Sequence, residues 1–77
     1  MESIISVIPK SNYLLELKFS TGELRMFDAA PCLEKGVFKK LKNVALFNQA
    51  YIAYDTVCWP DNLDISHETL YLKSIKI

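Results

Sequence analysis

Alternating side chains between residues 13 and 28 constrain the fold of this chain more than any other feature of its sequence. Apolar residues occupy every second position in the first half of this segment: Tyr13, Leu15, Leu17 and Phe19. Successive side chains of a β-strand point to opposite faces, so this spacing predicts a strand with one buried face. Residues 20–23 predict a tight turn because Gly22 accepts a positive φ, and residues 24–28 predict the returning strand. We therefore expect an antiparallel hairpin over residues 13–28.

Shorter elements are expected on both sides of this hairpin. The β-branched run at residues 4–8 predicts a strand that ends at Pro9, followed by a turn. Pro31 ends the sheet, since proline cannot donate a hydrogen bond to a strand ladder. Between residues 33 and 49 the apolar spacing is helical but interrupted, so we expect two short helical turns, with Asn43 capping the second. Residues 50–59 predict a second hairpin, which turns at Asp55-Thr56.

The closing segment WPDNLDISHETLY contains the only Trp and the only His of the chain. One interpretation is structural closure, in which Trp59 fills the core, residues 61–64 turn the chain and Ser66 caps a final helical turn. The other is a ligand or partner surface formed by Trp59, Asp64, His67 and Tyr71. We favour structural closure and keep these four residues as the candidate site. The tail, residues 72–77, either extends the helix or forms a strand.

The charge balance argues against a nucleic-acid partner for this chain alone. Nine basic and nine acidic residues cancel, so no excess of positive charge is present to neutralise phosphates. The densest basic cluster is expected to be the solvated face of a short helix: Lys35, Lys39, Lys40 and Lys42.

Hydropathy and cysteine content predict one globular domain, residues 1–77, in the cytoplasm. Hydrophobic residues make up 51% of the chain and charged residues 23%, which is typical of a globular rather than a disordered protein. No apolar run approaches the ~20 residues that span a bilayer, and no signal peptide is expected, so we expect no membrane association. Cys32 and Cys58 are expected to stay reduced, as small buried hydrophobic residues.

No catalytic, metal or cofactor site is expected. Cys58 and His67 are close in sequence, but Cys58 lies in a predicted strand, where burial raises the pKa of a thiol and makes it inert. The pattern Asp61, Asn62 and Asp64 lacks the central glycine and the final glutamate of a calcium loop. One His and two distant Cys do not give a zinc spacing. We therefore expect a protein that is not an enzyme.

Two long segments carry a resemblance to a family. They read YLLELKFSTGELRMFDAAPCL and GVFKKLKNVALFNQAYIAYDTVCWPDNLDISHETLY. The positions concerned are Phe27-Asp28, Pro31, Leu33, Phe38, Leu41, Phe47, Trp59-Pro60, Asp64-Ile65 and Leu70-Tyr71. In their order and spacing over about residues 4–71, they resemble the bacterial family called domain of unknown function 2442. The chain departs from the family at Asp61-Asn62, where Asn-Gly is frequent, and at His67, where Pro is frequent.

The resemblance implies an α+β fold: a small single domain with a mostly antiparallel sheet of hairpins and short helical segments. It implies no established activity. Some relatives carry a helix-turn-helix domain after this module, and others are encoded beside a second small protein, as in toxin–antitoxin pairs. This chain ends at Ile77, so we do not expect it to bind an operator directly.

Three hypotheses for function remain open. The first is a non-enzymatic protein-interaction module that binds a small protein partner or a second copy of itself, regulatory or antitoxin-like in a two-protein pair. Its expected surface is an exposed apolar patch that includes the first strand or the tail residues Leu72, Ile75 and Ile77. The second is a nucleic-acid-associated regulator, and the third is a small ligand-binding domain with a pocket at the candidate site.

Overall fold

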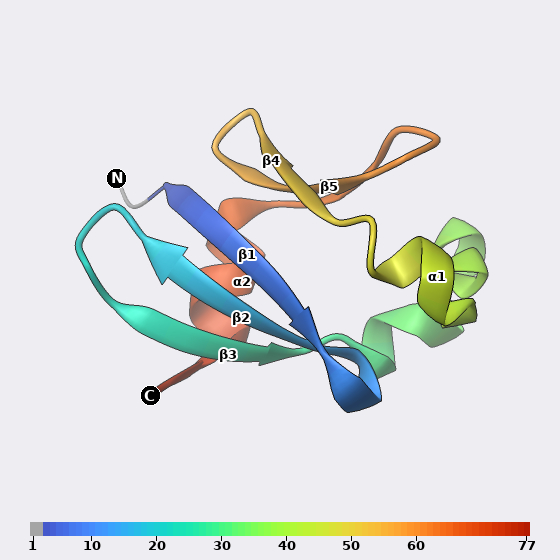
Figure 1. Ribbon diagram of the computed structural model, residues 1–77, viewed down its shortest axis with the longest axis horizontal. Helices are drawn as coiled ribbons and strands as arrows, with labels where there is room; N and C mark the ends of the chain where they lie inside the picture. Colours follow the sequence, from blue (N-terminus) through green and yellow to red (C-terminus); the bar gives the residue numbers. More distant parts are fainter. Residues whose placement is uncertain (1–2) are drawn as a thin grey trace.

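Two antiparallel sheets form the framework of the fold (Figure 1). The computed structural model describes residues 3–77, so the first two residues of the expected domain lie outside the described part. The first sheet has the strand order β1-β2-β3-β7: Ile4–Lys10, Leu14–Phe19, Leu24–Asp28 and Ile75–Lys76. The second has the order β4-β5-β6: Tyr51–Ala53, Thr56–Trp59 and Leu63–Ile65. This arrangement, with short helices, confirms the expected α+β fold.

The first hairpin, β2 and β3, agrees with its prediction except at its start: Tyr13 has a φ of 61° and belongs to the 3₁₀-helix Ser11–Tyr13, so β2 begins at Leu14. Gly22 has a φ of 93° in the turn, a value that favours glycine. Leu15 lies opposite Phe27 across the two strands, and both are buried. Leu17 and Phe19 are buried on the same face, as the period of two requires. Strand β1 pairs with β2 and extends through Pro9 to Lys10, slightly beyond the expected end.

Short helices follow the first sheet. Two 3₁₀-helices, Ala30–Glu34 and Gly36–Lys42, precede α1, Val44–Phe47. The side chain of Asn43 accepts a hydrogen bond from the backbone N–H of Leu46, at 3.3 Å, so Asn43 caps α1 as expected. The segment is therefore interrupted as predicted, and the 3₁₀-helix at Pro31 is an addition to the two expected turns.

The second hairpin differs in detail from its prediction. The positive φ values belong to Tyr54 and Asp55, at 53° and 64°. Two consecutive residues of this kind are typical of a type I′ hairpin turn. The turn therefore lies one residue earlier than expected, and Thr56 is the first, buried residue of β5. The hydroxyl of Thr56 donates to the carbonyl of Ile65 and ties β5 to β6.

Strand β6 corrects the expected turn over residues 61–64. Within residues 61–64, only Asp61 and Asn62 have positive φ, at 69° and 61°. Leu63 and Ile65 are buried and Asp64 is exposed, and all three residues pair with β5. An alternation this short is difficult to distinguish from a turn in the sequence, which is why the strand was not expected.

The tail takes both of the paths left open for it. Helix α2, His67–Lys73, is capped by Ser66, whose side chain accepts from the N–H of Thr69 at 3.2 Å. After α2 the chain reverses into β7, and the N–H of Ile77 donates to the carbonyl of Leu24 at 3.0 Å. The tail thus closes one edge of the first sheet.

The core lies between the two sheets and α2. In Figure 1, α2 lies behind the first sheet, and no helix covers the face toward the viewer. The covered face of this sheet contributes Leu15, Leu17, Phe19 and Phe27 to the core cluster, and the opposing elements contribute Val57, Trp59, Ile65 and Leu70. The first sheet therefore has an inner face that builds the core and an outer face that does not.

Candidate functional site

Trp59 is a core residue. Its side chain is 0% exposed, and the indole Nε1 donates to the carbonyl of Phe47 at 2.9 Å. The rings of Trp59 and Phe47 lie 6.0 Å apart between centroids. Trp59 therefore presents no side chain to a ligand or partner, and its inclusion in the candidate surface was wrong. Its large apolar ring is more stable in the core than in water.

Asp64 lies on β6 rather than on α2, the helix that carries His67 and Tyr71. It is exposed on β6, where it pairs with Cys58 of β5 and lines a hollow of about 120 Å³ with Tyr51 and Tyr54. Burial, followed by the nearby Asp64 charge, raises the pKa of the Cys58 thiol. The thiol also donates to the carbonyl of Ala53 at 3.6 Å. Cys58 is therefore a neutral structural thiol at neutral pH.

His67 and Tyr71 lie on α2, four residues apart and hence on one side of the helix. His67 is the half-buried first residue of α2, next to the Ser66 cap. Tyr71 packs edge-on against Phe19, with ring centroids 5.2 Å apart. The structure therefore distributes the four candidate residues over the core, β6 and α2.

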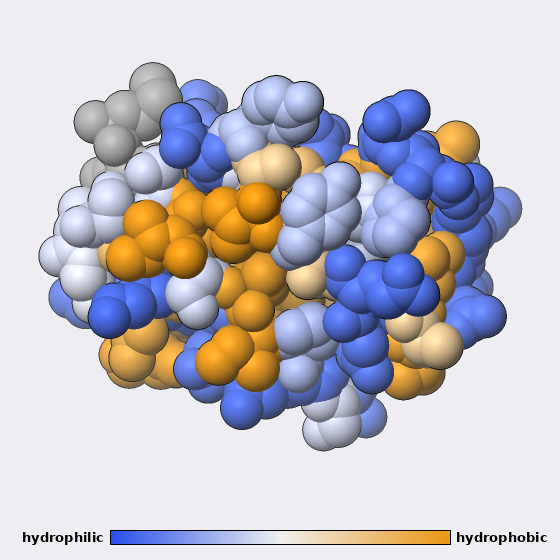
Figure 2. Space-filling view, turned by 45° about the horizontal axis from the view of Figure 1, so that its top comes forward, coloured by the Kyte–Doolittle hydropathy of each residue, from blue (hydrophilic) through white to orange (hydrophobic). Residues whose placement is uncertain are grey.

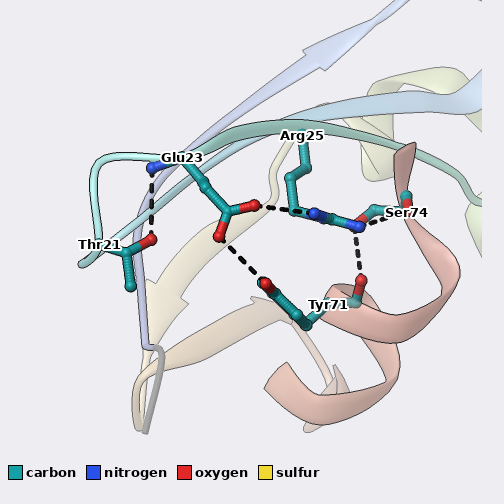
Figure 3. A network of polar contacts seen from close by, with 5 residues as sticks. All are labelled: Thr21, Glu23, Arg25, Tyr71 and Ser74. Atoms are coloured by element: carbon teal, nitrogen blue, oxygen red, sulfur yellow. Dashed lines mark hydrogen bonds and ion pairs between the residues drawn. The ribbon is translucent and has the colours of Figure 1, made fainter. Parts of the chain in front are cut away.

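Tyr71 belongs to a polar network that ties α2 to the first hairpin (Figure 3). Its hydroxyl donates to Glu23 Oε1 at 3.1 Å, and Arg25 Nη1 donates to Glu23 Oε2 at 2.9 Å. The Arg25 guanidinium lies over the Tyr71 ring, 4.4 Å from its centroid. Arg25 also donates to Ser74, from Nε to Oγ at 2.7 Å and from Nη2 to the backbone carbonyl at 2.9 Å. Arg25 thus completes the C-terminal end of α2.

The electrostatics of this network are those of a structural contact. The hydrogen bond from Arg25 is the largest cause that lowers the pKa of Glu23, and the Tyr71 hydroxyl lowers it further. Glu23 therefore stays ionised at neutral pH and is a poor proton donor. Among residues 3–77, no buried side-chain nitrogen or oxygen lacks a hydrogen-bond partner. The network therefore holds the tail helix against the first hairpin.

Other candidate sites are weaker. One hollow of about 460 Å³ is lined by residues that include Tyr13 and Phe47. Another, of about 440 Å³, is lined by residues that include Phe27 and Lys73. Neither includes Glu23 or Cys58, two groups whose pKa is displaced. Within the described residues, no three His, Cys, Asp or Glu side chains gather as a metal site would require. In the same part of the chain, no helix is long and apolar enough to cross a membrane.

The outer face of the first sheet is a further candidate surface. Side chains directly opposite one another on paired strands share a face, so the strand register defines two neighbouring rows across the sheet. One row is Ile8, Glu16, Met26 and Ile75, and the other is Ser6, Lys18, Leu24 and Ile77. We call these eight residues the outer sheet face.

Large apolar side chains of the outer sheet face are in contact with solvent. Ile8, Leu24, Ile75 and Ile77 are between 41% and 73% exposed. Figure 2 shows hydrophobic surface gathered over β1 and the strands beside it, with polar residues around it. The two segments expected to form an apolar patch, the first strand and the tail, are thus opposite edges of one sheet. Ile4 and Leu72 are exceptions, since Ile4 is buried and Leu72 lies on α2.

Charged residues within this face were not predicted to take part in a protein-binding surface. Glu16 and Lys18 are two residues apart on β2, so both point to the side opposite the buried Leu15 and Leu17. Glu16 makes a 3.8 Å ion pair with Lys10. Lys18 is exposed and makes no ion pair within residues 3–77. The alternation that predicted the hairpin already contained this information, since it assigns Glu16 and Lys18 to the outer face.

The fold and this surface define a small two-sheet α+β domain with one open sheet face. The model of a family described as Protein of unknown function (DUF2442) matches residues 4–76. The chain therefore belongs to this family, as its resemblance indicated. No curated protein and no solved structure is similar enough to count as a match.

Proposed function

We propose that this chain is a non-enzymatic protein-interaction module and that it binds another polypeptide through the outer sheet face. The supporting observation is the exposure of large apolar residues from three strands on a single sheet face. An antiparallel sheet with one solvated face normally places polar residues there. Exposed apolar residues are common singly, but a contiguous group of them is typical of a binding surface.

The charges around this face suit a protein partner better than a nucleic acid. Lys10 and Lys18 are accompanied by Glu16 and Asp28 on the same side of the sheet, so the face carries both signs. A phosphate backbone favours a surface of one sign. Opposite charges next to apolar groups are instead typical of interfaces between proteins, where they fix the register of the partner.

Glu23 and Cys58, two groups with a displaced pKa, support the non-enzymatic part of the proposal. Glu23 is held ionised by Arg25, and Cys58 is held neutral by burial, so each displacement has a structural cause. A regulatory role in a two-protein pair, antitoxin-like in arrangement, is the form of the proposal that the family resemblance favours. The proposal includes a cytoplasmic location. Cys32 and Cys58 form no disulfide, and the cytoplasm keeps thiols reduced.

Affinity capture with surface variants tests this function. A tagged chain is expressed in its own cells beside an untagged copy, so that a second copy and a different protein are identified separately by mass spectrometry. Ile8→Asp and Ile75→Asp each place a charge on the outer sheet face. Val37→Asp is the matched control, because Val37 is an exposed apolar residue on the 3₁₀-helix Gly36–Lys42.

The wild type and the control should retain the same polypeptide, and both outer-face variants should lose it. Equal retention by all four proteins would contradict the proposal. So would capture that depends on Val37 alone.

A further inference from the structure

The order of charges on β2 identifies one occupant for the outer sheet face. We propose that this face binds the same face of a second copy of the chain, in a two-fold dimer in which Glu16 of each copy meets Lys18 of the other. The inference rests on the proposed function, because it names the partner of the same surface.

The strand register of the first sheet favours this two-fold arrangement over the alternative placement of the axis. Two sheets that pack face to face align their strands to within about 30°, and a dimer of identical chains uses one two-fold axis. That axis either follows the strands or crosses them. If it follows the strands and passes between β2 and β3, Glu16 lies over Met26 of the other copy, and Lys18 lies over Leu24. Both charges would then be desolvated against apolar side chains, which is unfavourable.

An axis that crosses the strands at Leu17 gives a complementary arrangement. It exchanges the two rows of the face, because Leu17 lies midway between Glu16 and Lys18. Glu16 then faces Lys18 of the other copy, and Lys18 faces Glu16, so two opposite-charge pairs form at the centre.

The same exchange matches the apolar residues. Met26 lies over Leu24 of the other copy, Ile75 over Ile77, and Ile8 over Ser6. Apolar groups therefore cover apolar groups on the β3 and β7 side of the face, while the central charges are paired. Lys18, which makes no ion pair in residues 3–77, would gain a partner.

The size of the face predicts a weak dimer. Four strands about 4.8 Å apart and two side-chain rows about 7 Å apart give a flat area of about 270 Å² per copy. Stable interfaces bury about 800 Å² per partner, so association should be concentration-dependent, with a dissociation constant on the order of micromolar or weaker. Salt should weaken it further, because even the central charge pairs of such a small interface lie close to solvent and are screened.

Charge-reversal variants test the register through sedimentation velocity, over protein concentrations from about 10 µM to about 1 mM. Glu16→Lys has two positive side chains at the centre of the face, and Lys18→Glu has two negative ones. Each variant alone should bind itself at least about tenfold more weakly than the wild type. A mixture of the two should recover dimers, because every central pair is then of opposite sign. The double variant Glu16→Lys/Lys18→Glu should also form dimers.

Recovery in the mixture also shows that both single variants are folded. Wild-type protein that is monomeric over the whole range overturns the inference. Dimers that persist unchanged in either single variant, or fail to return in the mixture, overturn the register. These failures are distinguishable from failure of the proposed function. Capture of a different protein that is lost with Ile8→Asp would still support the proposal of a protein-interaction module.

Discussion

Replacing Trp59 with Phe tests the assignment of the closing segment to the core. The substitution keeps an aromatic ring but removes the hydrogen bond from Nε1 to the Phe47 carbonyl, 2.9 Å long. That carbonyl also accepts from the N–H of Ala50 at 3.3 Å, so it does not become an unpaired buried group. The loss of the hydrogen bond should therefore stay near about 1 kcal/mol.

The smaller phenyl ring also fills the core less well, which lowers the free energy of unfolding further. It leaves a void of about 40 Å³, which at about 24 cal/mol per Å³ destabilises the fold by about another 1 kcal/mol. The total loss in the free energy of unfolding is therefore about 2 kcal/mol. A chain of 77 residues has about 4–12 kcal/mol in all, so this loss should lower Tm by about 8–16 °C.

Urea unfolding followed by circular dichroism measures this effect without relying on Trp fluorescence. Tyr54→Phe is the control, because Tyr54 is 91% exposed and the ring is again retained. The control should change the free energy of unfolding by less than about 0.5 kcal/mol. If Trp59→Phe changes it as little as Tyr54→Phe does, the indole is not in the core and the argument from burial fails.

Three further predictions concern the network at α2 and the thiols. Arg25→Met should lower the free energy of unfolding by at least about 2 kcal/mol, since two hydrogen bonds to Ser74 are lost; an unchanged thermal melt would refute this. The pKa of Glu23 is lowered in the folded state from its ordinary value of 4.5, so its contribution is present above that pH and disappears as the pH falls through the folded pKa. The Tm advantage of the wild type over Glu23→Gln should accordingly shrink below about pH 4.5, and an advantage that instead grows on acidification would contradict the sign. Because Cys58 is buried with a raised pKa and Cys32 is half-buried, iodoacetamide should label Cys32 faster in the folded protein, as peptide mass spectrometry can measure, and equal rates would count against the burial of Cys58.

Local signals explain which parts of the fold could be predicted from the sequence. The first hairpin follows from a period of two and from Gly22, and the caps Asn43 and Ser66 follow from side-chain chemistry within three residues. Strand β6 and the turn at Tyr54 were harder to predict. The strand is only three residues long, and a bulky residue with positive φ is uncommon.

The candidate surface depends on contacts that are distant in sequence. The pairing of β7 with β3 brings Ile75 opposite Met26, and no local pattern identifies that partner. The network of Arg25 with Ser74 likewise joins segments far apart in the chain. Periodicity could assign Glu16 and Lys18 to the outer face, but only the strand order places them at its centre.

The outer sheet face is tested most directly by nuclear magnetic resonance of the wild-type protein, with backbone amide shifts recorded over increasing protein concentration. The proposed interaction predicts shift changes that cluster on β2 and β3, around Glu16, Lys18, Leu24 and Met26, and that diminish at high salt. Amide shifts that do not change with concentration, or changes that gather on α2 and the β4-β5 turn, would contradict it.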